Sequence, residues 1–156
     1  MEIEKKYLVK HLPENLETYP HKELVQSYIS RSPVIRIRHS KSPEEEKYVL
    51  TIKGGGLAIR QEYELLISRE EYESLRKKEE GKVLEKTRYK IPLNTPSLYG
   101  KKLVAELDLF HGHLEGLYLV EVEFETVAEM NAFNPPEWFG EDVSGTNQYH
   151  NSTLSL

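Results

Sequence analysis

The chain has 156 residues, of which 38% are hydrophobic and 30% charged, and its formal net charge is -5. This length and composition predict one globular domain over residues 1–156, because such a chain can enclose a single core. The acidic balance argues against a protein that coats nucleic acid, and the lack of cysteine excludes disulfides and thiolate metal sites, as expected for a cytoplasmic protein.

Apolar residues recur at every second position through most of the sequence, which is typical of strands with two unlike faces. We expect eight strands, near residues 2–10, 22–31, 34–40, 46–53, 58–67, 82–92, 102–110 and 117–126. Turn-forming residues separate them: Ser32-Pro33, Ser42-Pro43, Gly54-Gly55-Gly56, Asn94-Thr95-Pro96 and Gly112. The short connections predict antiparallel pairing.

Two helices are expected between and after these strands. The first begins at Ser68, which with Glu71 forms a capping box, and ends at Gly81. The second begins near Thr126 and ends before Pro135. A C-terminal segment over residues 149–156 is expected to close one end of the sheet.

Charged residues share one face of nearly every expected strand, because alternate side chains of a strand point the same way. In the first strand, Glu2, Glu4 and Lys6 oppose Ile3 and Tyr7. The corresponding face of the later strands carries Arg36, Arg38, Lys53, Arg60, Glu62, Glu64, Lys86, Arg88, Glu106, Asp108, Glu121 and Glu123. The ordinary interpretation is a face turned to water, but such a face usually also contains Ser, Thr, Asn and Gln.

Eight strands can close into a barrel, which removes exposed sheet edges. If the apolar face turned inward, the helices would have no apolar sheet surface to cover. If the charged face turned inward, the helices would pack on an apolar exterior. We therefore predict a mainly β fold: a closed eight-stranded antiparallel barrel with a few helices outside and a charged bore.

A charged bore must hold water, cations and an anionic ligand, because unpaired charges in a dry interior cost several kcal/mol each, on the order expected for buried ions. Carboxylates are hard oxygen ligands that suit Mg²⁺ or Mn²⁺, whereas Lys and Arg bind phosphate oxygens. Together they predict a metal and polyphosphate site.

The segment Glu2-Ile3-Glu4-Lys5-Lys6 resembles the Glu-x-Glu-x-Lys motif of the CYTH superfamily, the triphosphate tunnel metalloenzymes. The resemblance extends nearly from end to end, through Arg36-Ile37-Arg38, Leu50-Thr51-Ile52-Lys53-Gly54, Arg60-Gln61-Glu62-Tyr63-Glu64, Glu85-Lys86-Thr87-Arg88-Tyr89, Glu106-Leu107-Asp108 and Val120-Glu121-Val122-Glu123-Phe124. The chain is most similar to the small bacterial inorganic triphosphatases. The resemblance implies an eight-stranded tunnel in which a divalent metal assists hydrolysis of a triphosphate.

This interpretation assigns a role to most of the charged residues of the bore. The expected metal ligands are Glu2, Glu4, Glu121 and Glu123, with Glu62, Glu64 and Asp108 completing the water shell or a second ion site. The expected phosphate ligands are Lys6, Arg36, Arg38, Lys53, Arg60, Lys86 and Arg88. Lys86, Glu4 and Tyr28 are the expected catalytic residues, and water is the attacking group. The resemblance places Tyr28 beside Lys86, although simple packing explains a Tyr equally well.

Alternatives remain at this point. Nucleoside or thiamine triphosphatases and class IV adenylate cyclases belong to the same superfamily, and a non-catalytic polyphosphate-binding module would use the same basic residues. Thr146-Asn147-Gln148-Tyr149 stands where bacterial relatives tend to have Asp-Lys-Arg-Tyr, so phosphate contacts from this segment are in doubt. The expected partner is a small-molecule triphosphate, without nucleic acid or membrane, for a monomer or homodimer.

Overall fold

The computed structural model describes residues 2–55, 59–96 and 100–156, with only the backbone described at residues 95 and 96. The described strands are β1 (Glu2–Val9), β2 (His21–Arg31), β3 (Val34–Lys41), β4 (Glu46–Lys53), β5 (Ile59–Arg60), β6 (Glu62–Ile67), β7 (Glu80–Pro96), β8 (Lys102–Phe110), β9 (Tyr118–Glu123) and β10 (Phe139–Asp142). The helices are α1 (Arg69–Arg76), α2 (Val127–Ala132) and α3 (Asn151–Leu154), with single 3₁₀ turns at Leu16–Thr18 and Gly112–Leu114. No helix in the described ranges combines the length and hydropathy needed to span a membrane.

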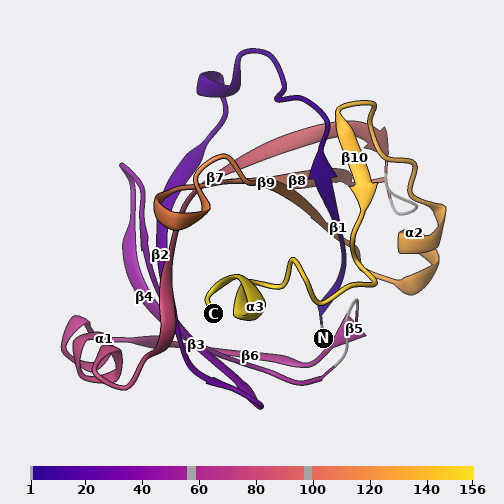
Figure 1. Cartoon of the computed structure of the whole chain (residues 1–156). Helices are drawn as coiled ribbons and strands as arrows, with labels where there is room; N and C mark the ends of the chain where they lie inside the picture. The colour runs from indigo at the N-terminus through magenta and orange to yellow at the C-terminus, as the bar shows by residue number, and fades with distance from the viewer. Residues whose placement is uncertain (1, 56–58, 97–99) are drawn as a thin grey trace.

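The strands form one antiparallel sheet that curls into a nearly closed barrel (Figure 1). Their order is β10-β1-β9-β8-β7-β2-β3-β4-β6, and β5 pairs with β1 through Glu2 with Arg60 and Ile3 with Ile59. Because β5 and β6 are pieces of one strand interrupted at Gln61, this pairing brings the two ends of the sheet together. The expected antiparallel barrel is therefore confirmed and is nearly closed. With β5 and β6 counted as one strand, the described sheet has the eight expected strands and one more, β10, beside β1.

Three features differ from the expectations. Helix α1 ends at Arg76, and Gly81, expected to stop it, lies in β7 with φ of 75°. Strand β7 continues to Pro96, through the segment expected to turn. Strand β10, absent from the expectations, lies beside the second half of β1, where Val9 pairs with Phe139. Gly56 and residue 58, which belonged to an expected turn and strand, lie outside the described residues.

The larger apolar core lies on the outer face of the barrel. It consists of side chains from β1, β7, β8 and β9, covered by α2 and the segment that leads to β10. The rings of Phe133 and Phe139 pack against Tyr7, with centroids 6.3 and 5.0 Å away. The outer face of β6 is largely open to solvent, since Tyr63 is 65% and Leu65 61% exposed, whereas Tyr72 of α1 packs against Tyr48 of β4 with ring centroids 5.0 Å apart.

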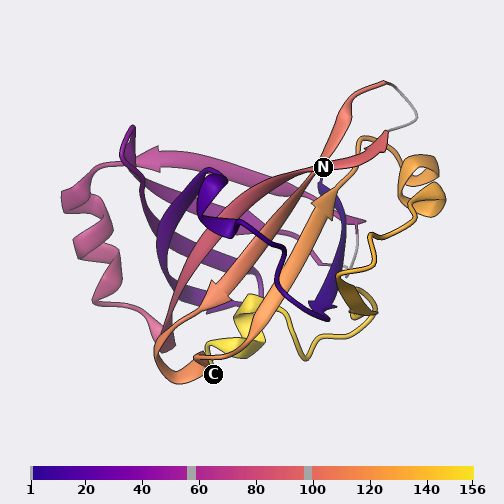
Figure 2. The same cartoon turned by 90° about the horizontal axis from the view of Figure 1, so that it is seen from above.

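One end of the bore is apolar. Leu84, Phe110 and Leu119 face inward there with Tyr28, each at most 3% exposed, and form a second core cluster. The C-terminal segment packs against this cluster through Tyr149 and Leu154. Helix α3 accordingly appears within the ring of strands in Figure 1. Figure 2 shows it beside the loop that joins β8 to β9. The C-terminal segment thus closes one end, as expected from its sequence.

Candidate active site

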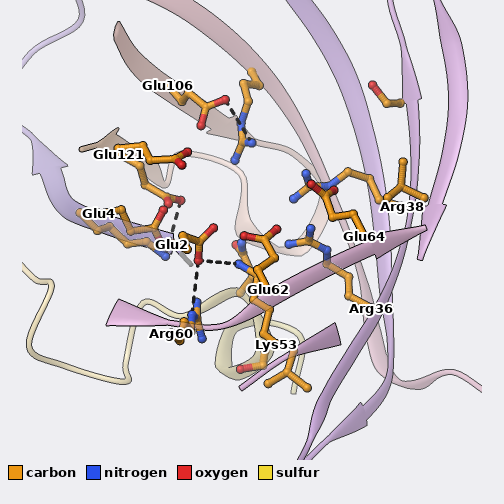
Figure 3. A pocket seen from close by; sticks show the side chains of 18 of the residues that line it. Glu2, Glu4, Arg36, Arg38, Lys53, Arg60, Glu62, Glu64, Glu106 and Glu121 are labelled. Carbon is orange, nitrogen blue, oxygen red and sulfur yellow. Dashed lines mark hydrogen bonds and ion pairs between the residues drawn. The ribbon is translucent and has the colours of Figure 1, made fainter. Parts of the chain in front are cut away.

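The remainder of the bore is a cavity of about 300 Å³ lined almost entirely by charged side chains (Figure 3). Its basic residues are Lys6, Lys22, Arg36, Arg38, Lys47, Lys53, Arg60 and Arg88. Its acidic residues are Glu2, Glu4, Glu62, Glu64, Glu106, Glu121 and Glu123. Tyr28, Val34, Ser40, Val49, Asn151 and Ser152 complete the lining. The charged face of the strands therefore turns inward, as predicted.

Four carboxyl groups at one side of the cavity form two hydrogen-bonded pairs. Burial, together with the neighbouring Glu121 carboxylate, raises the pKa of Glu4 to about 9. Burial would also raise the pKa of Glu121, but Lys6 and the hydrogen bond from Glu4 hold it well below its usual range. At neutral pH this pair therefore shares one proton and carries one negative charge.

The second pair consists of Glu2 and Glu62. Burial and the hydrogen bond with Glu2 raise the pKa of Glu62 to about 7. Burial opposes ionisation of Glu2 as well, but the hydrogen bond with Glu62 and the Lys53 ammonium bring its pKa below the ordinary value. Each pair thus uses a proton to relieve the repulsion between its two carboxylates.

Basic residues neighbour both pairs. Lys53 Nζ lies 3.3 Å and Arg60 Nε 3.5 Å from Glu2 Oε1. Lys6 Nζ lies 3.8 Å from Glu121 Oε1 and donates a hydrogen bond of 2.9 Å to the carbonyl oxygen of Tyr149. These contacts tie β1, β4, β5, β9 and the C-terminal segment to one side of the site.

Lys86 and Asp108, two of the expected site residues, lie behind the lining. Asp108 accepts hydrogen bonds from Arg88 Nε at 2.8 Å and Arg88 Nη2 at 2.9 Å, and Lys86 Nζ lies 2.7 Å from Asp108 Oδ2. Burial disfavours the Asp108 carboxylate, but Arg88 and Lys86 lower its pKa to about 2. Burial lowers the pKa of Lys86 to about 7 despite its acidic partner. Both oxygens of Asp108 are therefore engaged by protein cations.

Arg36 and Arg38 of β3 face the carboxyl pairs from across the cavity (Figure 3). Arg36 Nη2 donates to Thr51 Oγ1 at 3.1 Å, and Arg38 Nε donates to Gln26 Oε1 at 2.9 Å. Tyr28, whose pKa is raised by burial although Arg36 and Arg38 oppose the shift, also hydrogen-bonds Arg36. The polar partner of the Tyr28 hydroxyl is thus Arg36, whereas the Lys86 ammonium pairs with Asp108.

The C-terminal segment contributes to the same cavity. Asn151 and Ser152 line it. Arg31 of β2 anchors the segment, because it donates hydrogen bonds to Ser152 O at 3.1 Å and to Ser155 Oγ at 2.7 Å. Burial, with Lys6 and Arg60 nearby, lowers the pKa of His150 to about 4. His150 is therefore neutral at physiological pH, in a segment where the sequence lacks the usual basic pair.

Sequence patterns located most of the lining but missed several residues. Lys22, Lys47, Ser40 and Ser152 were not expected in the site, and Glu106 had been placed on the charged face without a role. Lys47 could have been found, because it has the same strand parity as Lys53. Lys22 gave no signal, since the inward positions of β2 mix polar and apolar side chains.

The lining fits a hard divalent cation bound together with a substrate. Nowhere in the described ranges do three or more His, Asp or Glu side chains already converge closely enough to hold a metal ion. The two carboxyl pairs each retain a proton where a cation could sit. Mg²⁺ usually takes one or two protein carboxylates, with waters and substrate phosphates as its other ligands, so pairs of this kind suit it.

Comparison with known proteins identifies the family. No protein-family model matches the chain. An inorganic triphosphatase of Nitrosomonas europaea is 40% identical over 156 residues, which cover 99% of this chain and 97% of that protein. The chain belongs to the inorganic triphosphatase family. An inorganic triphosphatase of Acetivibrio thermocellus is 32% identical over 159 residues, covering 98% of this chain and 92% of that protein.

The fold agrees with membership of the inorganic triphosphatase family. A crystal structure of an inorganic triphosphatase matches the chain with a TM-score of 0.70 at 36% identity, covering 100% of this chain and 95% of that one. The resemblance drawn from the order of the charged strand motifs is therefore confirmed. In this member of the inorganic triphosphatase family, most charged residues of those motifs line the bore, and Lys86 and Asp108 lie behind the lining.

Proposed function

We propose that the protein hydrolyses inorganic tripolyphosphate to diphosphate and phosphate in the barrel cavity, with Mg²⁺ or Mn²⁺ as the cofactor. The observation that carries this proposal is an enclosed lining of eight basic and seven acidic side chains. The basic residues suit a chain of phosphates, and the carboxyl groups suit a divalent cation bound beside that anion. A module that only binds polyphosphate would be weakened by so many carboxylates.

The basic residues bind and orient the phosphates. Lys6, Arg36, Arg38, Lys53, Arg60 and Arg88 all line the cavity, so a linear triphosphate within it meets donors from several strands. These donors also neutralise the charge that develops on the leaving group, which is the main electrostatic demand of phosphoryl transfer. Lys22 and Lys47 add to this set.

The carboxyl groups hold the cation and position water. We assign the cation to Glu4 and Glu121 with Glu2 and Glu62, while Glu64 and Glu123 orient water molecules around it. A bound divalent cation supplies Lewis-acid polarisation of the phosphate oxygens. With a cation bound, Glu4 and Glu62 would be ionised, their protons passing to solvent, and these carboxylates would help to orient the attacking water.

Lys86 and Arg88 act with Asp108 as one unit. Asp108 has both oxygens occupied by these two cations, so we assign it the role of fixing them instead of binding the metal. Arg88 reaches the cavity and contacts the substrate, whereas Lys86 sets the positive potential beneath it. Tyr28 positions Arg36 through its hydroxyl group.

Phosphate release from tripolyphosphate, ATP and thiamine triphosphate tests the function. Each substrate is supplied with Mg²⁺, Mn²⁺ or EDTA, and cyclic AMP is assayed alongside. We expect metal-dependent release that is fastest with tripolyphosphate and no cyclic AMP. Faster release from either organic triphosphate, or cyclic AMP formation, would reassign the substrate. Binding of tripolyphosphate without any hydrolysis would leave only a binding module.

We also propose that residues 1–156 act as one catalytic domain in the cytoplasm, as a monomer or homodimer. The continuous sheet, which joins both halves of the chain, supports the single domain. Light scattering at several protein concentrations separates the monomer from the homodimer, and limited proteolysis that released a stable fragment would argue against one domain.

A further inference from the structure

The basic residues on the two sides of the cavity have different partners. On the side of β1, β5 and β9, the basic groups pair with carboxylates: Lys53 and Arg60 with Glu2, and Lys6 with Glu121. Arg88 pairs with Asp108. On the β3 side, neither Arg36 nor Arg38 forms an ion pair with a carboxylate among the described residues. Neither of these two guanidinium groups therefore has a carboxylate in direct contact within the part of the chain that the structure describes.

Neutral oxygen atoms hold these two Arg side chains in place. Gln26 of β2 lies directly opposite Arg38 in the sheet and is 0% exposed, and its Oε1 accepts the Arg38 Nε hydrogen bond. Thr51 of β4 lies opposite Arg36 and is also 0% exposed, and its Oγ1 accepts from Arg36 Nη2. Each acceptor therefore orients an Arg without adding a negative charge.

A neutral acceptor makes the free site less stable than a carboxylate would. Burial and the nearby charges of Arg36 and Arg88 lower the pKa of Arg38 to about 9, which shows how poorly this guanidinium is compensated. A buried Arg gains most from an ionised partner, because a carboxylate adds the attraction between opposite charges to the hydrogen bond. Keeping Gln26 and Thr51 neutral leaves that interaction to an incoming anion.

We propose that Gln26 and Thr51 are positioning residues that hold Arg38 and Arg36 as uncompensated charges for the phosphates of the substrate. This inference rests on the proposed function, and it adds two residues that touch neither the metal nor the reacting atoms. It divides the cavity into a cation side, built from the carboxyl pairs, and an anion side, built from Arg36 and Arg38. Gln26 and Thr51, called the tethers below, set the affinity of the anion side for phosphate.

The Gln26→Glu variant tests the first tether, because Glu has nearly the same shape and would give Arg38 a carboxylate partner. We expect KM for tripolyphosphate to rise by about tenfold or more, with a smaller change in kcat, because a charge-assisted bond must now be broken or shared. The melting temperature should stay level or rise. Gln26→Met, which removes the tether without adding charge, should raise KM by only a few-fold and lower the melting temperature.

Gln61→Glu provides the matched control. Gln61 is exposed between β5 and β6, outside the cavity lining, so the same change in net charge there should leave KM within about twofold of wild type. A folded Gln26→Glu protein with the KM of wild type would overturn the tether proposal. So would a Gln61→Glu control whose KM rose as much as that of Gln26→Glu.

Thr51 supplies an independent test by direct binding. Calorimetric titration with tripolyphosphate in EDTA measures the anion side alone. Thr51→Val keeps the side-chain shape but removes the acceptor, so we expect affinity to fall by about three- to tenfold, the range of one net hydrogen bond. Thr51→Ser retains the hydroxyl and should restore most of the affinity. Equal affinities for the Val and Ser variants would refute the role of Thr51.

These measurements separate the inference from the proposed function. If wild type binds tripolyphosphate in EDTA and the tether variants weaken binding, the tethers stand even where no metal-dependent hydrolysis is found. If wild type hydrolyses tripolyphosphate but the tether variants keep its KM and its affinity, the function stands and the tethers fail.

Discussion

Lys86 Nζ lies 2.7 Å from Asp108 Oδ2, in an ion pair that is closed to solvent. The same ammonium group lies 5.3 Å from the centre of the Phe110 ring, at the boundary between the charged cavity and the apolar end of the bore. Lys86 is thus held by one carboxylate, one aromatic face and little water, which explains why its charged form is disfavoured.

Replacing Lys86 should lower the catalytic rate while leaving the protein folded. We expect Lys86→Met to lower kcat by about 100-fold or more, as expected for loss of an electrostatic group near the transferred phosphate. The fold should persist, because Met fills similar space and Arg88 still holds Asp108. Phosphate release and circular dichroism check both points. Full turnover in Lys86→Met or Lys86→Ala would remove Lys86 from the mechanism.

The buried Lys86 should also make stability depend on pH. Its pKa is about 7 in the fold and higher when unfolded, so the unfolded chain binds more protons between these values. The unfolding free energy should therefore rise from pH 7 towards pH 9 by on the order of 2 kcal/mol more in wild type than in Lys86→Met. Urea unfolding of both proteins at the two pH values measures the difference. Parallel pH dependence in the two proteins would contradict it.

Glu4→Gln should abolish metal-dependent turnover while leaving the barrel folded. The amide can still donate a hydrogen bond to Glu121, but it offers the cation no second carboxylate. We expect at least a 100-fold loss of activity and a melting temperature that is unchanged or higher, since a buried ionisable group has been removed. Glu44→Gln, an exposed change in the turn between β3 and β4, is the control and should stay fully active.

Binding of the cation should release protons. Burial and Glu121 raise the pKa of Glu4 to about 9, and burial and Glu2 raise that of Glu62 to about 7, so at neutral pH the first pair holds a proton and the second is partly protonated. A cation must displace these protons, and its apparent affinity should increase as pH rises from about 6 to about 9. Calorimetric titration of Mn²⁺ in two buffers of different ionisation heat counts the released protons. Affinity independent of pH would exclude these pairs as the cation site.

Gly81→Ala should loosen the C-terminal segment. Gly81 has φ of 75°, and an added Cβ would collide with the Arg31 guanidinium and the Ser155 carbonyl oxygen, both of which anchor that segment. We expect a loss of about 1–3 kcal/mol of stability, because both backbone strain and a steric clash are introduced. Gly145→Ala meets nothing within 4 Å and serves as the control in thermal unfolding.

Strand parity predicted most of the site because every second residue must face the bore once the barrel closes. It placed Glu2, Glu4, Arg36 and Arg38 in the lining without any knowledge of strand order. Parity says nothing about which strands become neighbours. The family resemblance grouped Glu4 with Glu121, but nothing in the sequence predicted that Arg38 would meet Gln26. These contacts depend on register between strands that are far apart in the chain.

The limits of the elements were predicted less well where tertiary contacts override local preference. Gly81 usually ends a helix, yet here the pairing of Tyr28 with Glu80 begins β7 just before it. Strand β10 has only four residues, too few for a periodic signal, and exists because β1 offers it an edge.

The barrel is joined at two residue pairs, Glu2 with Arg60 and Ile3 with Ile59. Glu2 and Arg60 also place their side chains in the cavity. The seam that completes the wall thus contains two of the cavity-lining residues, so closure of the barrel also completes this side of the cavity. A substitution at Glu2 should therefore affect both the closure of the barrel and the proposed cation site.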